Sequence, residues 1–164
     1  FIMLSRSHYG CVKRLLEIEI PELSDGTIML YSVARDAGSR SKIAVYTEYT
    51  NVDPIGAVIG EKGRRIANVL KELSGEKIDV ILYDKDPVKF IANALSPAKD
   101  VKVSIKDETK KEALALVNDK NLSLAIGKKG QNVKLASRLT HYKIEVKPEE
   151  QENTETTEEA SVEE

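Results

Sequence analysis

Two short stretches of the chain combine glycine with basic residues in a spacing that suits contact with a phosphate. They are residues 59–66 (IGEKGRRI) and residues 126–133 (IGKKGQNV). Glycines three positions apart let the backbone turn sharply and leave a face without Cβ atoms, which a sugar-phosphate chain can approach closely. Backbone amides that open a helix after such a turn also favour an anion. Both stretches therefore predict a surface for a phosphate backbone.

The residues expected to form this surface lie within and beside the two glycine pairs. In the first stretch they are Ile59, Gly60, Glu61, Lys62, Gly63, Arg64 and Arg65, and in the second Ile126, Gly127, Lys128, Lys129, Gly130, Gln131, Asn132 and Lys134. Glu61 places a negative charge beside the expected path, so we expect the second stretch to make the tighter electrostatic contact. A structural alternative stays open, in which the glycines serve only the packing of a helix–turn–helix corner.

The two stretches belong to a longer internal repeat. They align at an offset of 67 residues, and residues 77–80 (KIDV) align with residues 143–146 (KIEV) at an offset of 66. A repeated octet with matching flanks indicates two copies of one domain.

Each copy is predicted to contain the same elements in the order helix, strand, strand, helix, turn, helix, strand. In the first copy, the hydrophobic spacing and the turn residues predict these elements over residues 8–20, 27–34, 42–47, 54–59, 64–73 and 77–83. In the second copy, they predict a helix over 87–95 and strands over 101–105, 113–117 and 143–147. Two further helices are expected on either side of the second loop. Units of this size bury little surface on their own, so we expect each copy to pack against the other. The short connection over residues 84–87 favours a rigid tandem.

The charge is distributed unevenly along the chain. The formal net charge is −2, but residues 85–147 carry +7, residues 1–84 carry −1, and the last 17 residues hold eight Glu without a basic residue. The basic second copy therefore suits a polyanionic partner. The acidic end is interpreted as a solubilising tail, with the alternative that it competes for the basic face.

The sequence gives little support for a membrane span, a metal site or a catalytic site. The lone Cys11 suggests a small buried side chain in a reducing cytosol, and no apolar run approaches the about 18 residues of a membrane span. His8 and His141 have no neighbours at metal-ligand spacing, so neither a metal nor a cofactor is expected. No pair of carboxylates suggests acid–base catalysis, and we expect a protein that is not an enzyme.

The element order and the paired loops resemble the type II KH domain, in which two strands precede the Gly-x-x-Gly. More narrowly, residues 4–147 resemble the tandem KH region of the NusA family of bacterial transcription factors. The segments that carry the resemblance include residues 34–45 (ARDAGSRSKIAV), 72–79 (ELSGEKID), 93–98 (NALSPA) and 122–136 (LSLAIGKKGQNVKLA).

The resemblance implies an α+β fold of two tandem type II KH domains, each a three-stranded mixed sheet packed against three helices. It assigns residues 1–5 to the last strand of a preceding OB-fold barrel, and residues 6–84 and 85–147 to the two KH domains. Residues 148–164 lie outside the resemblance, and their polar, acidic composition predicts a disordered tail. The resemblance also implies a monomeric cytoplasmic protein that binds single-stranded nascent RNA and, in a longer chain, RNA polymerase and other transcription factors. Pausing, termination and antitermination are the processes it would modulate.

Two other classes of protein remain as alternative interpretations. One is a KH accessory region of an RNA-processing or ribosome-associated protein, and another is a protein-interaction scaffold whose loops no longer bind RNA. For Arg35, Arg40 and Lys42, beside the predicted strand turn, two interpretations stay open, which are contact with RNA and simple solvation.

Overall fold

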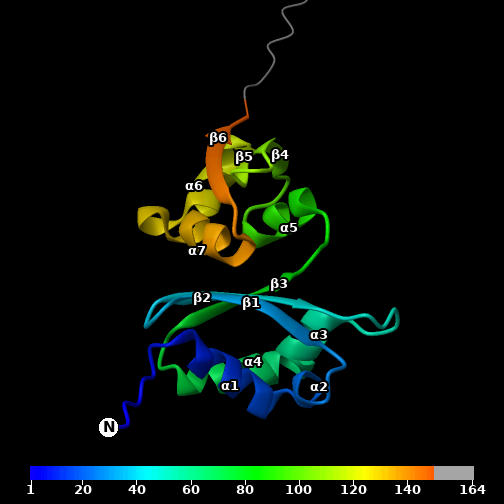
Figure 1. Cartoon of the computed structure of the whole chain (residues 1–164), viewed down its shortest axis with the longest axis vertical. Coiled ribbons are helices and arrows are strands. Elements are labelled where there is room, and N and C mark those ends of the chain that lie inside the picture. Colours follow the sequence, from blue (N-terminus) through cyan, green and yellow to red (C-terminus); the bar gives the residue numbers. More distant parts are fainter. Residues whose placement is uncertain (150–164) are drawn as a thin grey trace, which may run out of the picture.

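The internal repeat of the sequence is also a repeat of structure. The computed structural model describes residues 1–149, and these contain two domains that lie one above the other along the long axis (Figure 1). The first contains α1 (Tyr9–Glu19), α2 (Pro21–Ser24), β1 (Met29–Asp36), β2 (Arg40–Tyr46), α3 (Pro54–Ile59), α4 (Arg64–Glu72) and β3 (Lys77–Leu82). The second contains α5 (Pro87–Ala94), β4 (Lys102–Asp107), β5 (Glu112–Val117), α6 (Asp119–Ile126), α7 (Gln131–Thr140) and β6 (Lys143–Pro148).

Both sheets have the same mixed topology. β2 lies between β1 and β3, antiparallel to the first and parallel to the second, and β5 has the same relation to β4 and β6. A parallel pair needs a crossover connection, and here it is the helix–loop–helix that carries each Gly-x-x-Gly. This arrangement confirms the predicted fold of two type II KH domains.

Local sequence explains where most elements begin. Pro54 and Pro87 occupy the first turns of α3 and α5, where a missing amide costs nothing. Asp86 caps α5 by accepting a hydrogen bond from the Val88 amide, whereas Asp53 stands at the N-cap of α3 without such a bond. Pro21 ends α1 as expected, but it also opens the additional one-turn helix α2.

Several boundaries differ from the prediction by one or two residues. The first strand starts at Met29, because the preceding Thr27 belongs to a turn in which its amide donates to Asp25. Residues 1–5 form neither helix nor strand, so the strand expected there is absent from the described structure. The last strand continues to Pro148, and the Glu149 amide donates to Val117, so the predicted tail of residues 148–164 starts two residues too early. The rest of that tail lies outside the described residues.

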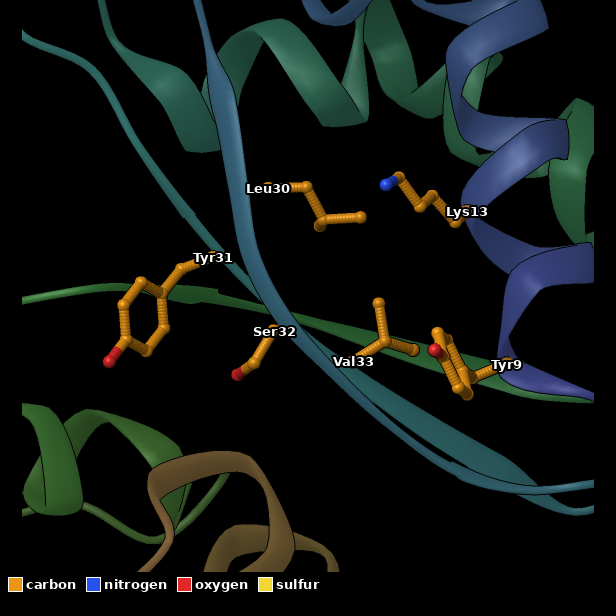
Figure 2. Close-up of a pocket in the computed structure, with 6 residues that line it drawn as sticks. All are labelled: Tyr9, Lys13, Leu30, Tyr31, Ser32 and Val33. Carbon is orange, nitrogen blue, oxygen red and sulfur yellow. The ribbon is translucent and has the colours of Figure 1, made fainter.

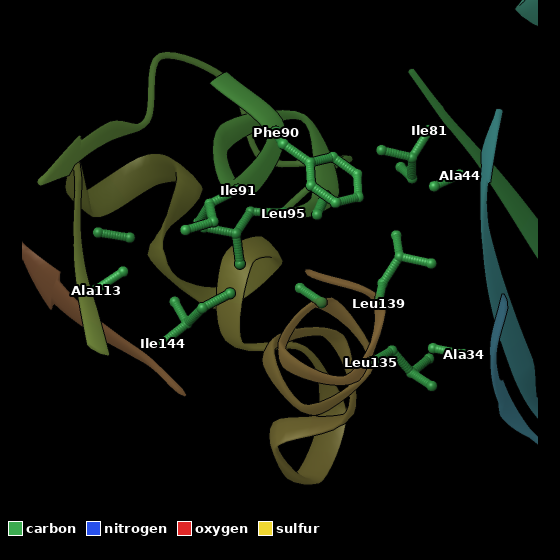
Figure 3. Packing of buried hydrophobic residues seen from close by; sticks show 13 residues of the cluster. Ala34, Ala44, Ile81, Phe90, Ile91, Leu95, Ala113, Leu135, Leu139 and Ile144 are labelled. Carbon is green, nitrogen blue, oxygen red and sulfur yellow. The ribbon is translucent and has the colours of Figure 1, made fainter. Parts of the chain in front are cut away.

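Each domain packs helices on the inner face of its own sheet, but the first sheet is buried on both faces. Its inner face, with Ile43 and Val45, packs against α1, α3 and α4. Its outer face presents Ala34, Ala44 and Ile81 to α5 and α7 of the second domain (Figure 3). The expectation that each copy packs against the other is therefore confirmed, because one hydrophobic core spans both domains.

Candidate nucleic-acid interface

The two Gly-x-x-Gly loops have nearly the same backbone conformation. The first glycines, Gly60 and Gly127, have φ of 77° and 76° with ψ of 174° and 172°. The last glycines, Gly63 and Gly130, both have φ of 73°. The repeat seen in the sequence thus extends to the dihedral angles of the predicted binding loops.

The first glycine of each pair is required by packing. Its φ and ψ lie in a region that essentially only glycine adopts. A Cβ atom at Gly60 would lie 2.7 Å from Cγ of Arg65, and one at Gly127 would lie 2.7 Å from the backbone nitrogen of Asn132. The helix–turn–helix alternative therefore accounts for these two glycines.

Packing does not account for the second glycine or for the lysine before it. A Cβ at Gly63 would meet nothing within 4 Å, so bare backbone faces open space there. Lys62 and Lys129 are exposed, yet they have left-handed φ of 52° and 55°, a conformation that costs about 1 kcal/mol or more in a residue with a side chain. These features leave an accessible main-chain surface beside a positive charge, as the phosphate interpretation requires.

Most of the basic residues that were predicted beside the loops are exposed. Lys62 and Arg64 in the first loop and Lys128, Lys129 and Lys134 in the second are exposed. The other predicted residues of the loops that are open to solvent in full or in part are Ile59, Gly60, Glu61, Gly63, Ile126, Gly127, Gly130 and Gln131.

Arg65 and Asn132, which occupy equivalent positions, are committed to internal contacts. Arg65 forms an ion pair with Glu22 at 2.7 Å and donates to the Ala57 carbonyl. Asn132 is 2% exposed, and its Nδ2 donates to the carbonyls of Leu95 and Ala125. The Asn132 side chain therefore holds α7 in place and is buried in this structure, whereas the prediction placed it on the RNA surface.

Neither open interpretation holds for Arg35, since its side chain is 7% exposed and forms a two-pronged ion pair with Glu76. The same guanidinium donates to the carbonyls of Arg6 and His8, which ties the N-terminal segment to the sheet. Burial alone raises the pKa of Glu76, but the hydrogen bonds from Arg35 and from the Gly38 amide outweigh it and hold that pKa below its usual value.

Lys42 and Arg40 are also occupied, at the junction of the two domains. The Lys42 side chain is fully buried, and its Nζ donates to Asp79 at 3.1 Å and to the Ser96 carbonyl of the second domain at 2.7 Å. Arg40 binds the same carboxylate at 2.8 Å. Burial lowers the pKa of Lys42, and the charge of Asp79 opposes that effect. Lys42 therefore joins the two domains, and Arg40 supports it through the shared carboxylate of Asp79.

Two hollows lie between segments of the two domains, and one of them adjoins the second loop. One, of about 430 Å³, is lined by residues of the second loop together with Asp36 and Ser39 of the first domain. The other, of about 660 Å³, lies between the domains along the edge strand β3, where Leu82 and Ile55 face Ala92 and Lys99. The second hollow offers apolar surface next to an open strand edge, which suits unpaired bases.

Sequence reasoning missed Asp36 and Ser39 as parts of the site. Gln131 was predicted, and its Nε2 donates to Asp36 Oδ2 and to Ser39 Oγ, both at 2.7 Å. The only signal for Asp36 and Ser39 was their place in the segment of residues 34–45 that carries the family resemblance. Nothing local indicates that this turn meets a loop more than 90 residues away.

A further hollow lies at the opposite edge of the first sheet. It measures about 250 Å³ and is enclosed by α1 and β1 (Figure 2). Its lining consists of Tyr9, Lys13, Leu30, Tyr31, Ser32 and Val33. Because β1 and β3 are opposite edges of this sheet, the hollow is separate from the one between the domains.

Residues 1–149 contain neither a metal-binding cluster nor a membrane-spanning helix. No cluster of three His, Cys, Asp or Glu residues in this range is placed to hold a metal ion. None of the helices in this range has both the length and the apolar character needed to cross a bilayer. Cys11 is partly exposed, in contrast to the buried position expected for it.

Comparison with known proteins agrees with the fold and the loops. Residues 6–83 match the model of the NusA-like first KH domain, and residues 87–154 match that of the NusA-like second KH domain. The transcription termination/antitermination protein NusA of Halalkalibacterium halodurans is 54% identical over 148 residues, and that of Bacillus subtilis is 53% identical over 148 residues. These alignments cover 90% of this chain but only 38% and 40% of the relatives, so the chain spans about two fifths of their length.

The NusA protein of Thermus thermophilus is 48% identical over 143 residues, which are 87% of this chain and 37% of the relative. Among solved structures, the crystal structure of APE1850 matches with a TM-score of 0.59 at 22% identity, over 82% of this chain and 96% of that one. At this identity the match supports the fold alone.

Proposed function

The chain belongs to the NusA family as a tandem of its two KH domains, and on that premise we propose that it binds single-stranded RNA through both Gly-x-x-Gly loops. The KH mode clamps about four nucleotides of backbone in each loop. Two loops on one rigid body therefore suit a strand of about eight nucleotides.

Backbone and bases would be held by different parts of the surface. The bare main chain at Gly63 and Gly130 would meet the phosphates, with Lys62, Lys128 and Lys129 supplying positive charge. Bases would lie beside the loops and along the hollow at the β3 edge. Specificity would then come from hydrogen bonds to the Watson–Crick edges of the bases.

The observation that supports this proposal most directly is the shared conformation of the loops. Each places a lysine in the left-handed region directly before an exposed glycine, although nothing in the packing of the described residues requires it. A strained, solvent-facing arrangement that occurs twice in one chain is best explained by a ligand common to both loops.

The wider role follows from the named relatives. We propose that the module acts as a monomer that binds the nascent transcript in the cytoplasm, as a binding module and not as an enzyme. In a longer protein of this family, RNA polymerase and other transcription factors would be its partners, and the RNA contact would modulate pausing, termination and antitermination.

The test is a charge reversal in both loops at once. A variant carrying Glu61→Asp, Lys62→Asp, Lys128→Asp and Lys129→Asp should bind an eight-nucleotide single-stranded RNA at least about 100-fold more weakly than the wild type at low salt, because three phosphate contacts become repulsive. Fluorescence anisotropy over a range of salt concentrations measures both the affinity and its salt dependence.

The matched control changes the β4–β5 turn, with Lys110→Asp and Lys111→Asp. These two lysines are exposed and lie outside both loops. The control should lose far less affinity than the loop variant. Binding by the loop variant within about twofold of the wild type would show that the loops are not the RNA site.

A further inference from the structure

We infer that the RNA site of the second domain is shared between the domains, with Ser39 of the first domain contacting the bound phosphate chain and Asp36 limiting its affinity. This inference rests on the proposed function. It adds two residues of the first domain, which lie outside both Gly-x-x-Gly loops, to the site of the second.

The link between the domains is the first residue of α7. Gln131 directly follows Gly130, and the two N–H groups of its side-chain amide reach Asp36 Oδ2 and Ser39 Oγ at 2.7 Å each. Asp36 ends β1, and Ser39 lies in the turn that leads to β2. The β1–β2 turn therefore holds the start of α7, where the backbone amides face the expected phosphates.

The same turn forms a wall of the hollow at the second loop. The hollow of about 430 Å³ is lined by Lys128, Lys129 and Lys134 on one side, and by the turn on the other. An RNA backbone bound in this hollow would lie beside the turn. The hydroxyl of Ser39 accepts from Gln131 and keeps its own proton to donate to a phosphate oxygen.

Asp36 is the only carboxylate among the residues that line this hollow. It is exposed, and its carboxylate accepts a hydrogen bond from the neutral amide of Gln131 and forms no ion pair within the described residues. A fixed negative charge among three ammonium groups weakens the attraction of any phosphate backbone. Because contacts to bases are unaffected, Asp36 lowers the affinity for RNA regardless of its sequence.

Packing between the domains makes this arrangement specific to the second loop. At the other end of α7, the Leu139 carbonyl accepts a hydrogen bond from Ser32 of β1, so the helix is tied to the first sheet at both ends. In the first loop the residue equivalent to Gln131 is Arg64, which is exposed. The β4–β5 turn of the second domain, which includes Glu108, lines neither of the two hollows between the domains.

The first experiment compares two neutralised carboxylates, Asp36→Asn and Glu108→Gln. Both remove one negative charge from an exposed hairpin turn, and asparagine can still accept the hydrogen bond from Gln131. Asp36→Asn should tighten binding of the eight-nucleotide RNA about threefold at low salt, the size expected for a unit charge about 7 Å away in water. Glu108→Gln should change it by much less, and equal effects of the two variants would overturn the role of Asp36.

The second experiment asks whether the first domain touches RNA bound at the second loop. In a Lys62→Asp chain, whose first loop is weakened, a four-nucleotide RNA is titrated while amide signals are followed by NMR. The amides of Gly38 and Ser39 should shift with the same midpoint as those of Gly130 and Gln131. Shifts at Gly130 without any at Ser39 would overturn the shared site. No shift at Gly130 would instead show that the proposed function is wrong, and the inference would fall with it.

Discussion

At the scale of single residues, the two glycines of each loop have different tasks. Gly127 lets α7 pack closely on the end of α6, where a Cβ would lie 2.7 Å from the backbone of Asn132. A Cβ at Gly130 would have open space around it, because its nearest contact beyond the neighbouring residues would be Cε of Lys134 at 3.9 Å. One glycine therefore serves stability, and the other leaves main chain accessible to a ligand.

Alanine substitutions should separate these two tasks. Gly127→Ala should destabilise the protein by about 3 kcal/mol, because it adds a backbone clash to a Gly-only conformation. Gly130→Ala should cost only about 1 kcal/mol, the penalty of a left-handed residue, but it should weaken RNA binding by covering the bare backbone. Urea unfolding and anisotropy measure the two effects, and equal destabilisation would contradict the division of tasks.

At the scale of elements, α7 joins the two domains. Its first residue follows the second loop, its apolar side packs within its own domain, and its contacts extend to β1 and β2 of the first sheet. Leu135 and Leu139 are 1% and 0% exposed and belong to the core that includes Ala34 and Ala44 (Figure 3). Such a helix couples the stability of one domain to that of the other.

Leu135→Ala tests this coupling. The lost contacts and the cavity should cost about 3 kcal/mol, and both domains should still unfold in a single transition because they share a core. Circular dichroism and tyrosine fluorescence, recorded during urea unfolding, would measure the loss of stability and show the number of transitions. Leu124→Ala, at a position on α6 that is 45% exposed, should cost less than about 0.5 kcal/mol. Two separate transitions, with only one shifted by Leu135→Ala, would contradict the shared core.

At the scale of the whole molecule, a buried ionic contact supplements the apolar core. Asp79 accepts hydrogen bonds from Arg40 and Lys42, and Lys42 also reaches the Ser96 carbonyl across the interface. Burial alone raises the pKa of Asp79, but the hydrogen bond from Arg40 and the charge of Lys42 hold it below its usual value. The contact between the two domains thus includes a carboxylate whose ionised form is favoured.

Asp79→Asn should therefore destabilise the tandem in a pH-dependent way. At neutral pH the loss should be about 3 kcal/mol, because the buried Lys42 loses its countercharge. A lowered carboxyl pKa stabilises the fold fully above the usual aspartate pKa. This stabilisation is lost as the pH falls below that value and through the lowered pKa of the folded state. The difference in the free energy of unfolding between wild type and variant, measured by urea titration, should shrink as the pH is lowered. Glu145→Gln, at an exposed pair with Lys106, is the control, and a gap that does not change with pH would contradict the assignment.

Much of the fold could be predicted from the sequence because its cues are local. The repeat, the prolines at helix starts and the alternation of apolar residues predicted the element order and most boundaries. The misplaced features depended on particular hydrogen bonds that the hydrophobic pattern does not show. The Thr27 amide donates to Asp25 only two positions away, and the Glu149 amide donates to Val117 of the neighbouring strand.

The sequence by itself determined the two loops, since the conformation of Gly60 and Gly127 follows from glycine and its nearest neighbours. Only the tertiary structure decided which polar side chains are free. Arg35 is buried against Glu76, which lies 41 positions further along the chain, and Gln131 is held by Asp36 across 95 positions. Whether a charged group meets solvent, a partner or RNA depends on segments that meet only after folding, and neither composition nor spacing encodes that proximity.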